Sequence, residues 1–188
     1  MQNQDAILQV IQPLFKDRKN ILEIGSGTGQ HAVYFAQKMP ELVWYTSDKK
    51  GNHQGILAWM EDAALDNVRA PISLDVSRDE WPNTEIDAVF SANTAHIMSW
   101  LEVEALIAGV GAQLANNSLF VLYGPFNYDG NFTSDSNARF DQWLKERDPQ
   151  SGVRDFEALD KLAQKSGMAL ENDFEMPANN RILCWRKR

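Results

Sequence analysis

One short stretch constrains the fold more than any other, the run Ile21–His31, which joins an apolar strand to a helix through a glycine-rich turn. Glu23 interrupts the apolar residues of the strand, and Gly25, Gly27 and Gly29 then follow at every second position. Because glycine lacks a Cβ atom, this turn can bend sharply and lets a ligand lie against the backbone. The helix after it offers unpaired N–H groups and a partial positive charge at its start. Open α/β sheets bind nucleotides at such strand–turn–helix units.

The residues around the glycines indicate which nucleotide to expect. The dinucleotide pattern G-x-G-x-x-G/A requires a small residue where Gln30 stands, and the phosphate-binding pattern G-x-x-x-x-G-K-[ST] requires a Lys that is absent here. The pattern present, E-x-G-x-G-x-G, resembles the first motif of class I S-adenosylmethionine-dependent methyltransferases. That resemblance implies that the methionine part of the cofactor lies across the turn, with the acidic residue orienting its amino group. The alternative is a tight turn without a ligand. The residues placed against the cofactor are Glu23, Gly25, Ser26, Gly27 and Gly29.

Length and composition set further bounds. The 188 residues suit one domain over 1–188, and no apolar run approaches the ~20 residues that span a membrane. The start of the chain lacks a basic region followed by an apolar run, so it does not resemble a secretory signal. Cys184 is the only cysteine, which excludes an internal disulfide. We therefore expect a cytoplasmic protein with no membrane partner.

The net charge of −8 disfavours a nucleic-acid partner, since an acidic surface repels the phosphate backbone. We expect a small-molecule substrate instead. The sequence does not indicate the oligomeric state.

Apolar periodicity predicts alternating strands and helices. A first helix is predicted over 5–16, ending or bending near Pro13. Strands are predicted at 20–25, 42–47, 72–74, 86–91 and 119–123, and further helices at 29–38, 52–65, 101–115, 137–146 and 155–166. Segment 67–71 reads as a connector, and 168–176 with 181–186 reads as a hairpin around 177–180.

Two acidic residues follow predicted strands at the edge where a nucleotide would lie. Asp48 ends the second strand, where a carboxylate can accept hydrogen bonds from both ribose hydroxyls. In the class I fold, the position of Asp75 typically meets the exocyclic amine of adenine, and Val76 would pack on the ring. For both aspartates the alternative is a capping role in a turn or at a helix start.

Residues that could touch the substrate follow the fourth and fifth strands. Asn93 and His96 are candidates to contact the sulfur end of the cofactor or the acceptor, and His96 could equally be a packed or capping histidine. The polar segment 127–137 is expected to form a substrate loop or lid, with a solvated connector as the alternative. It carries Tyr128 and Asp129, which could handle a proton.

Longer segments resemble a domain-of-unknown-function family that includes methyltransferase-like protein twenty-six. After the fourth strand that family usually has Asn-Met-Ile-His-Ile, of which Asn93 and His96 are kept here. The resemblance implies a single-domain, Rossmann-like α/β fold with S-adenosylmethionine as cofactor. The expected sheet has seven mostly parallel strands, an antiparallel C-terminal hairpin strand and helices on both faces. The resembling segments are 23–32, 122–126, 132–137, 147–149 and 176–180.

The leading hypothesis is a methyltransferase that acts on a small or medium-sized acceptor, with His96, Tyr128 or Asp129 as the candidate catalytic base. A non-catalytic scaffold or sensor that binds the same cofactor is the alternative from another class. A nicotinamide dehydrogenase is a third possibility, weakened by Gln30. We expect no metal, since the sequence has only three histidines and no H-x-x-x-H spacing.

Overall fold

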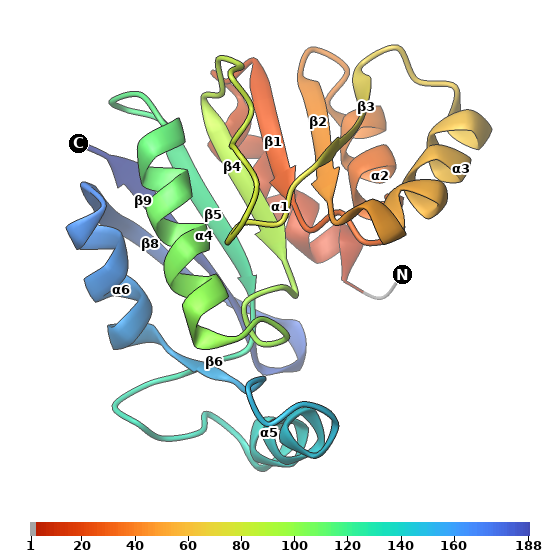
Figure 1. The fold of residues 1–188 in the computed structure, drawn as a ribbon. Helices are drawn as coiled ribbons and strands as arrows, with labels where there is room; N and C mark the ends of the chain where they lie inside the picture. Colours follow the sequence, from red (N-terminus) through yellow and green to blue (C-terminus); the bar gives the residue numbers. More distant parts are fainter. Residues whose placement is uncertain (1–2) are drawn as a thin grey trace.

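The computed structural model describes residues 3–188; Met1 and Gln2, part of the segment considered above for a secretory signal, lie outside the described residues. A seven-stranded sheet in the order β3-β2-β1-β4-β5-β9-β8 forms its centre (Figure 1). The first five strands in that order are parallel, and β9 runs antiparallel to both of its neighbours. This confirms the expected fold. The strands are β1 Asn20–Ile24, β2 Val43–Asp48, β3 Val68–Ser73, β4 Ala88–Ala92, β5 Leu119–Gly124, β8 Met168–Met176 and β9 Asn180–Lys187.

Helices cover both faces of this sheet, and each face has its own apolar core. On the face toward the viewer in Figure 1, α4 and α6 pack Leu106, Val110 and Leu159 against the strands. On the opposite face, α1 and α2 contribute Ile11 and Phe35. Burial of both faces explains why the parallel strands are almost continuously apolar. The helices are α1 Gln4–Phe15, α2 Gln30–Lys38, α3 His53–Ala63, α4 Trp100–Gln113, α5 Asp135–Arg147 and α6 Phe156–Lys165.

The order of the strands fixes where a ligand can bind. From β1 the chain proceeds to β2 and β3 on one side, and β4 and β5 are then added on the other side of β1. The carboxyl ends of β1 and β4 therefore meet where the connections diverge. In open α/β sheets a crevice forms at this switch point.

Beyond the carboxyl end of β5 the chain builds a small lobe that includes α5 (Figure 1). The two-residue strands β6 Phe126–Asn127 and β7 Arg154–Asp155 pair in parallel at its base. Segment 127–137, expected as a loop, is largely ordered by local structure. A tight turn joins Tyr128 to Asn131, and α5 already begins at Asp135 with a Ser134 cap.

One local prediction needs correction. Segment 67–71 is not a connector, because β3 runs over Val68–Ser73 and pairs with β2. The exposed residues of this edge strand do not alternate with buried apolar ones, so the sequence pattern did not predict its first half. The prediction for the first helix is confirmed, because α1 ends at Phe15, two residues after Pro13. Pro13 is tolerated because the buried residues of α1 anchor it to the core.

We predict that Trp185 is a major contributor to stability. It is fully buried on β9, stacks on Phe120 with ring centroids 5.5 Å apart, and donates a 2.9 Å hydrogen bond from Nε1 to Asp160. Trp185→Ala should lower the free energy of unfolding by about 3–5 kcal/mol in urea denaturation. The matched control Trp59→Ala removes a partly exposed indole from α3 and should cost less than about 1 kcal/mol. Equal losses in the two variants would contradict this assignment.

Candidate functional site

The glycine turn leaves β1 and enters α2 with Gly25, Gly27 and Gly29 all at positive φ. Two of these glycines serve packing. A Cβ atom on Gly25 would lie 2.5 Å from Cγ2 of Thr94, and one on Gly29 would lie 2.9 Å from the backbone of Ile56. At Gly27 a Cβ atom would meet nothing within 4 Å. The backbone at Gly27 is therefore the part of the turn that is open to a ligand.

Glu23 is a buried carboxylate directly beneath this turn, with only 2% of its surface exposed. Its Oε2 accepts hydrogen bonds from the Ser26 hydroxyl at 2.9 Å and from the Trp44 indole at 3.2 Å. Its Oε1 has no hydrogen-bond partner within residues 3–188. Burial raises the pKa of Glu23 to about 7, against the two hydrogen bonds that lower it. A cation beside Oε1 would supply the compensation that this carboxylate lacks.

Asp48, the last residue of β2, ties the second strand to the turn. Its Oδ2 accepts a 2.7 Å hydrogen bond from the backbone N–H of Gly27, and its Oδ1 accepts from Asn52 at 2.8 Å. Oδ1 also accepts a 2.7 Å hydrogen bond from the backbone N–H of Lys49. Since a carboxylate oxygen has about two acceptor positions, Oδ1 is filled and Oδ2 keeps one position for a ligand. Asp48 thus holds the turn in place and presents a carboxylate beside the open backbone.

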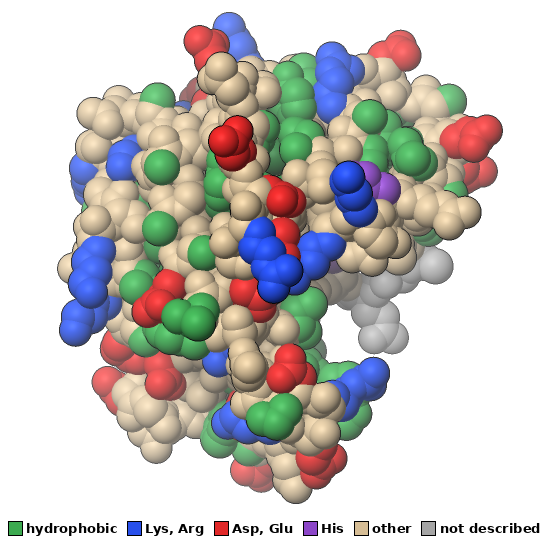
Figure 2. All heavy atoms as spheres, viewed as in Figure 1, with side chains coloured by type: hydrophobic (Ala, Val, Ile, Leu, Met, Phe, Trp, Pro, Cys, Tyr) green, Lys and Arg blue, Asp and Glu red, His purple; other side chains and the backbone are tan. Residues whose placement is uncertain are grey.

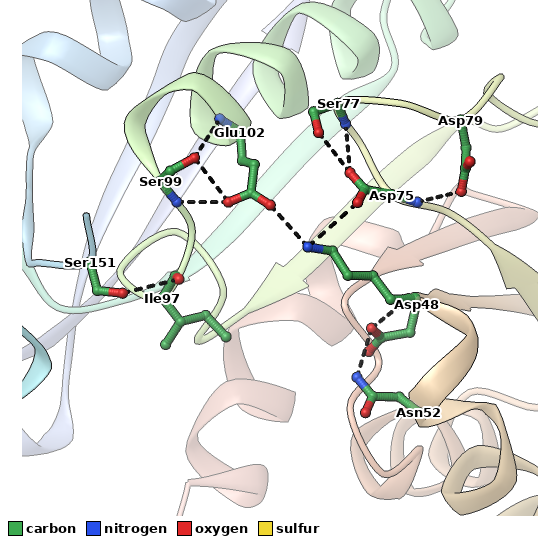
Figure 3. A network of polar contacts seen from close by, with 10 residues as sticks. Asp48, Asn52, Asp75, Ser77, Asp79, Ile97, Ser99, Glu102 and Ser151 are labelled. Carbon is green, nitrogen blue, oxygen red and sulfur yellow. Dashed lines mark hydrogen bonds and ion pairs between the residues drawn. The ribbon is translucent and has the colours of Figure 1, made fainter. Parts of the chain in front are cut away.

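These groups line one cleft of about 440 Å³ at the carboxyl ends of β1, β2 and β4, a size typical of small-molecule sites. One cation joins its walls: Lys49 Nζ lies 2.9 Å from Glu102 on α4 and 3.6 Å from Asp75 (Figure 3). The other lining residues are Glu23, Gly25, Ser26, Gly27, Thr28, Gln30, His31, Asp48, Asn52, Ala92, Asn93, Thr94, Ile97 and Met98.

Asp75 and Val76 follow β3 at the edge of this cleft but do not line it. Asp75 accepts hydrogen bonds from the backbone N–H and the hydroxyl of Ser77, which is the capping arrangement foreseen as the alternative (Figure 3). These bonds and Lys49 lower the pKa of Asp75. Val76 is buried against the α4 core. Of the two, only Asp75 is connected to the cleft, through Lys49.

Asn93 and His96 lie on the loop that leaves β4. Asn93 adopts a left-handed backbone conformation with φ 59°, and it lines both the cleft and a neighbouring hollow of about 380 Å³. His96 lines the second hollow and is 6% exposed. Burial, helped by the charge of Arg154, lowers the pKa of His96 to about 4, so its ring is neutral at pH 7.

Tyr128 and Asp129 lie outside both the cleft and the hollow that contains His96. The Tyr128 hydroxyl donates a 2.7 Å hydrogen bond to Asp173, and its ring stacks on Phe156. Burial, followed by the neighbouring Asp173, raises the pKa of Tyr128. Asp129 is exposed in the turn with φ 51°. Neither residue lines the cleft or the hollow.

Three hydrogen bonds from Ser151, Gly152 and Arg154 hold the backbone of the loop 93–98, and the sequence did not predict them. We call this set of contacts the clamp. The N–H of Gly152 donates to the His96 carbonyl at 2.9 Å, Ser151 donates to the Ile97 carbonyl at 3.2 Å, and Arg154 Nε donates to the Ala95 carbonyl at 3.0 Å (Figure 3 shows the Ser151 contact). The Arg-Asp-Pro motif at 147–149, just before this segment, was the one available signal. The clamp fixes the backbone that carries His96.

Within residues 3–188, no group of three or more His, Cys, Asp or Glu side chains is arranged to hold a metal ion. Among the helices that the structure describes, none has the length and apolar character needed to cross a bilayer. On the face drawn in Figure 2, acidic and basic side chains are interspersed.

Several solved structures share this fold. The S-adenosylmethionine-dependent methyltransferase SibL matches with a TM-score of 0.83 and 19% identity, over 98% of this chain and 54% of its own. An O-methyltransferase family protein from Burkholderia thailandensis matches with a TM-score of 0.82 and 12% identity, over 98% of this chain and 58% of its own. An O-methyltransferase family 2 protein from Planctomyces limnophilus was solved in complex with apigenin. It matches with a TM-score of 0.80 and 13% identity, over 90% of this chain and 51% of its own. The chain spans about half the length of these proteins.

At such identities the likeness concerns the fold, and family membership rests on the sequence. The sequence model of the family described as "Protein of unknown function (DUF938)" matches residues 1–187, nearly the whole chain, so the protein belongs to this family.

Proposed function

We propose that the protein binds S-adenosylmethionine and transfers its methyl group to a small molecule, with residues 1–188 acting as one domain. The observation that carries this proposal is the meeting of three features in one cleft. They are the open backbone at Gly27, the unpartnered Oε1 of Glu23 and the carboxylate of Asp48. The shared fold with proteins named as methyltransferases supports it.

The charge of the cleft favours this ligand over a dinucleotide. Its lining includes the carboxylates of Glu23, Asp48 and Glu102, whereas its one Lys is already paired with Glu102. A pyrophosphate would meet this acidic lining unfavourably, because like charges repel. A ligand that carries an ammonium and a sulfonium suits it. The same observation argues against a nicotinamide dehydrogenase.

The residues present fit the parts of the cofactor. Glu23 would hold the ammonium, Asp48 the ribose hydroxyls, and the turn at Gly25–Gly29 the methionine chain. At the adenine end, Asp75 and Val76 are the nearest groups after β3, and Asp75 reaches the site only if its bonds to Ser77 rearrange. Asn93 would lie at the sulfur end, where the cleft adjoins the second hollow.

When bound, this cofactor supplies a methyl group that its sulfonium already activates. The protein then has to align the acceptor and exclude water. Of the three candidate bases, His96 is favoured, because it alone shares a hollow with Asn93. Tyr128 is committed to Asp173, and Asp129 is solvated.

The experiment that tests the function has two readouts. Isothermal titration calorimetry with S-adenosylmethionine should give saturable binding. Incubation with cell extract should then produce S-adenosylhomocysteine above a no-protein control. Binding without product would favour the scaffold or sensor alternative, and absence of binding would overturn the proposal.

Gly27 provides the sharpest mutational test. Gly27→Ala places a methyl group in the space proposed for the ligand, and we expect cofactor affinity to fall at least about tenfold, or ~1.4 kcal/mol. Gly130→Ala is a matched control, because Gly130 also has positive φ and open surroundings but lies in the Tyr128–Asn131 turn. Both variants should lose a similar ~1–2 kcal/mol of stability to backbone strain. If both bind equally well, the ligand does not lie against Gly27.

Asp48→Ala removes the proposed acceptor for two ribose hydroxyls. We expect the affinity for S-adenosylmethionine to fall by about 2–3 kcal/mol, or about 30- to 150-fold. Part of this loss comes from the released N–H of Gly27, so Asp48→Asn, which keeps an acceptor oxygen, should lose less. Asp62→Ala, which removes an exposed carboxylate outside the cleft, is the control. Affinity unchanged in a folded Asp48→Ala protein would reject the ribose role.

Glu23 predicts how stability depends on pH. Its folded pKa of about 7 exceeds the ordinary value of 4.5, so the folded state binds the proton more tightly. The stability gained from this proton is complete below pH 4.5 and is lost as pH rises to about 7, a loss of about 3 kcal/mol. Urea denaturation of the ligand-free protein should show this decline, and Glu23→Gln should lack it.

Cofactor binding should lower the pKa of Glu23 again, because an ammonium beside Oε1 favours the ionised carboxylate. Binding should therefore release a proton near pH 6, and affinity should rise with pH up to about 7. Calorimetry in buffers of different ionisation enthalpy measures this release directly. A release that persists in Glu23→Gln would assign it to another group.

A further inference from the structure

The hollow beside the nucleotide cleft has the features of a second binding site. It encloses about 380 Å³, and Asn93 is the residue that it shares with the cleft. A ligand here would lie next to the sulfur end of the proposed cofactor. We call it the acceptor pocket; its lining residues are Asn93, His96, Pro125, Ser136, Asn137, Phe140, Ala178 and Asn180.

His96 is the buried polar group of this pocket. It is 6% exposed, and its ring nitrogens, which are not fully enclosed, have no hydrogen-bond partner within the described residues 3–188. Phe140 packs edge-on against the ring, with centroids 5.2 Å apart. Because the imidazole is neutral at pH 7, one of its nitrogens is an acceptor. A ligand in the pocket that donates a hydrogen bond can therefore pair with this acceptor.

Two amides add further acceptors. The Nδ2 of Asn137 donates to the Thr133 hydroxyl and the Asn179 carbonyl, both at 3.0 Å. The Nδ2 of Asn180 donates to the carbonyls of Pro177 and Ala178. With their donors used inside the protein, both residues have only Oδ1 left for a ligand. With one nitrogen of His96, the pocket therefore offers three acceptor atoms, while the side chains of Asn93 and Ser136 can both donate and accept.

The rest of the lining selects shape and charge. Pro125 and Phe140 provide apolar surfaces suited to the face or edge of a small ring. With His96 neutral, no lining side chain carries a charge, so a carboxylate or phosphate in the pocket would find no side chain with which to form an ion pair. The nearby Arg154 is already engaged with the carbonyls of Ala95, Met98 and Gln150.

We propose that the acceptor pocket binds the methyl acceptor, and that this acceptor is a small, uncharged ring compound that presents a hydroxyl or amino hydrogen to His96 and to the Asn137 and Asn180 amide oxygens. This inference rests on the proposed function. In the transfer step, a lone pair of the acceptor oxygen or nitrogen forms a bond to the methyl carbon while the carbon–sulfur bond breaks. The electron pair of that bond stays on sulfur. The acceptor hydrogen, made strongly acidic by methylation, passes as a proton to the free nitrogen of His96 and then to solvent.

The three histidines make a direct test possible, because His31 lines the nucleotide cleft and His96 lines the acceptor pocket. In protein labelled with ¹⁵N-histidine, S-adenosylhomocysteine should shift the His31 ring signals. Phenol added to that complex should then shift the His96 signals in a saturable way. Benzoate has the same ring with a negative charge and should bind at least about tenfold more weakly.

The outcomes separate the two proposals. If S-adenosylhomocysteine leaves all three histidines unchanged and calorimetry detects no binding, the proposed function fails and this inference fails with it. If the cofactor product binds but phenol leaves His96 unmoved, or benzoate binds as well as phenol, only the acceptor assignment is overturned.

A variant tests the role of the imidazole. His96→Phe keeps an aromatic ring against Phe140 and removes the acceptor nitrogen. We expect unchanged affinity for S-adenosylhomocysteine, and phenol affinity at least about tenfold lower by ligand-observed NMR. Asn131→Ala, in the exposed turn outside the pocket, should bind phenol like the parent protein. Unchanged phenol binding in His96→Phe would overturn the assignment.

Discussion

The fit between the glycine turn and the loop after β4 is the constraint on which the site depends. Gly25 allows Thr94 to approach closely, and Thr94 contacts Ser91, which donates a 2.8 Å hydrogen bond to the Ile24 carbonyl. These contacts join the carboxyl ends of β1 and β4, where the chain connections diverge. A larger residue at position 25 would separate the two strand ends, and the cleft and the acceptor pocket would then lose their shared wall.

Around this junction, polar groups are satisfied by the protein except at a few places. Asp48 holds the turn, and the Gly152–Arg154 segment holds the loop that carries His96. Oε1 of Glu23 and the ring nitrogens of His96 have no hydrogen-bond partner within residues 3–188, and each residue lines one of the two cavities. Because these atoms are not fully enclosed by the protein, a ligand in either cavity can reach them.

Much of the fold was predictable because its signals are local. Periodicity located the strands that are buried on both faces, and the glycine spacing located the turn at the end of β1. The edge strand β3 was not predicted over its full length, because its exposed residues show no alternation of apolar and polar side chains. The clamp by Ser151, Gly152 and Arg154 could not be foreseen, since it joins residues more than fifty positions apart.

The sequence by itself determined that a strand–turn–helix unit would bring Glu23 and Asp48 together at strand ends, because parallel strands bring their carboxyl ends to one edge of the sheet. Only the tertiary structure decided which groups remain free. Tyr128 is hydrogen-bonded to Asp173 and Asp75 to Ser77 in its own turn, whereas His96 lies beside Asn93 with no hydrogen bond to its ring within residues 3–188. The physical reason is that hydrogen-bond satisfaction and desolvation depend on neighbours from distant parts of the chain, which spacing along the sequence does not encode.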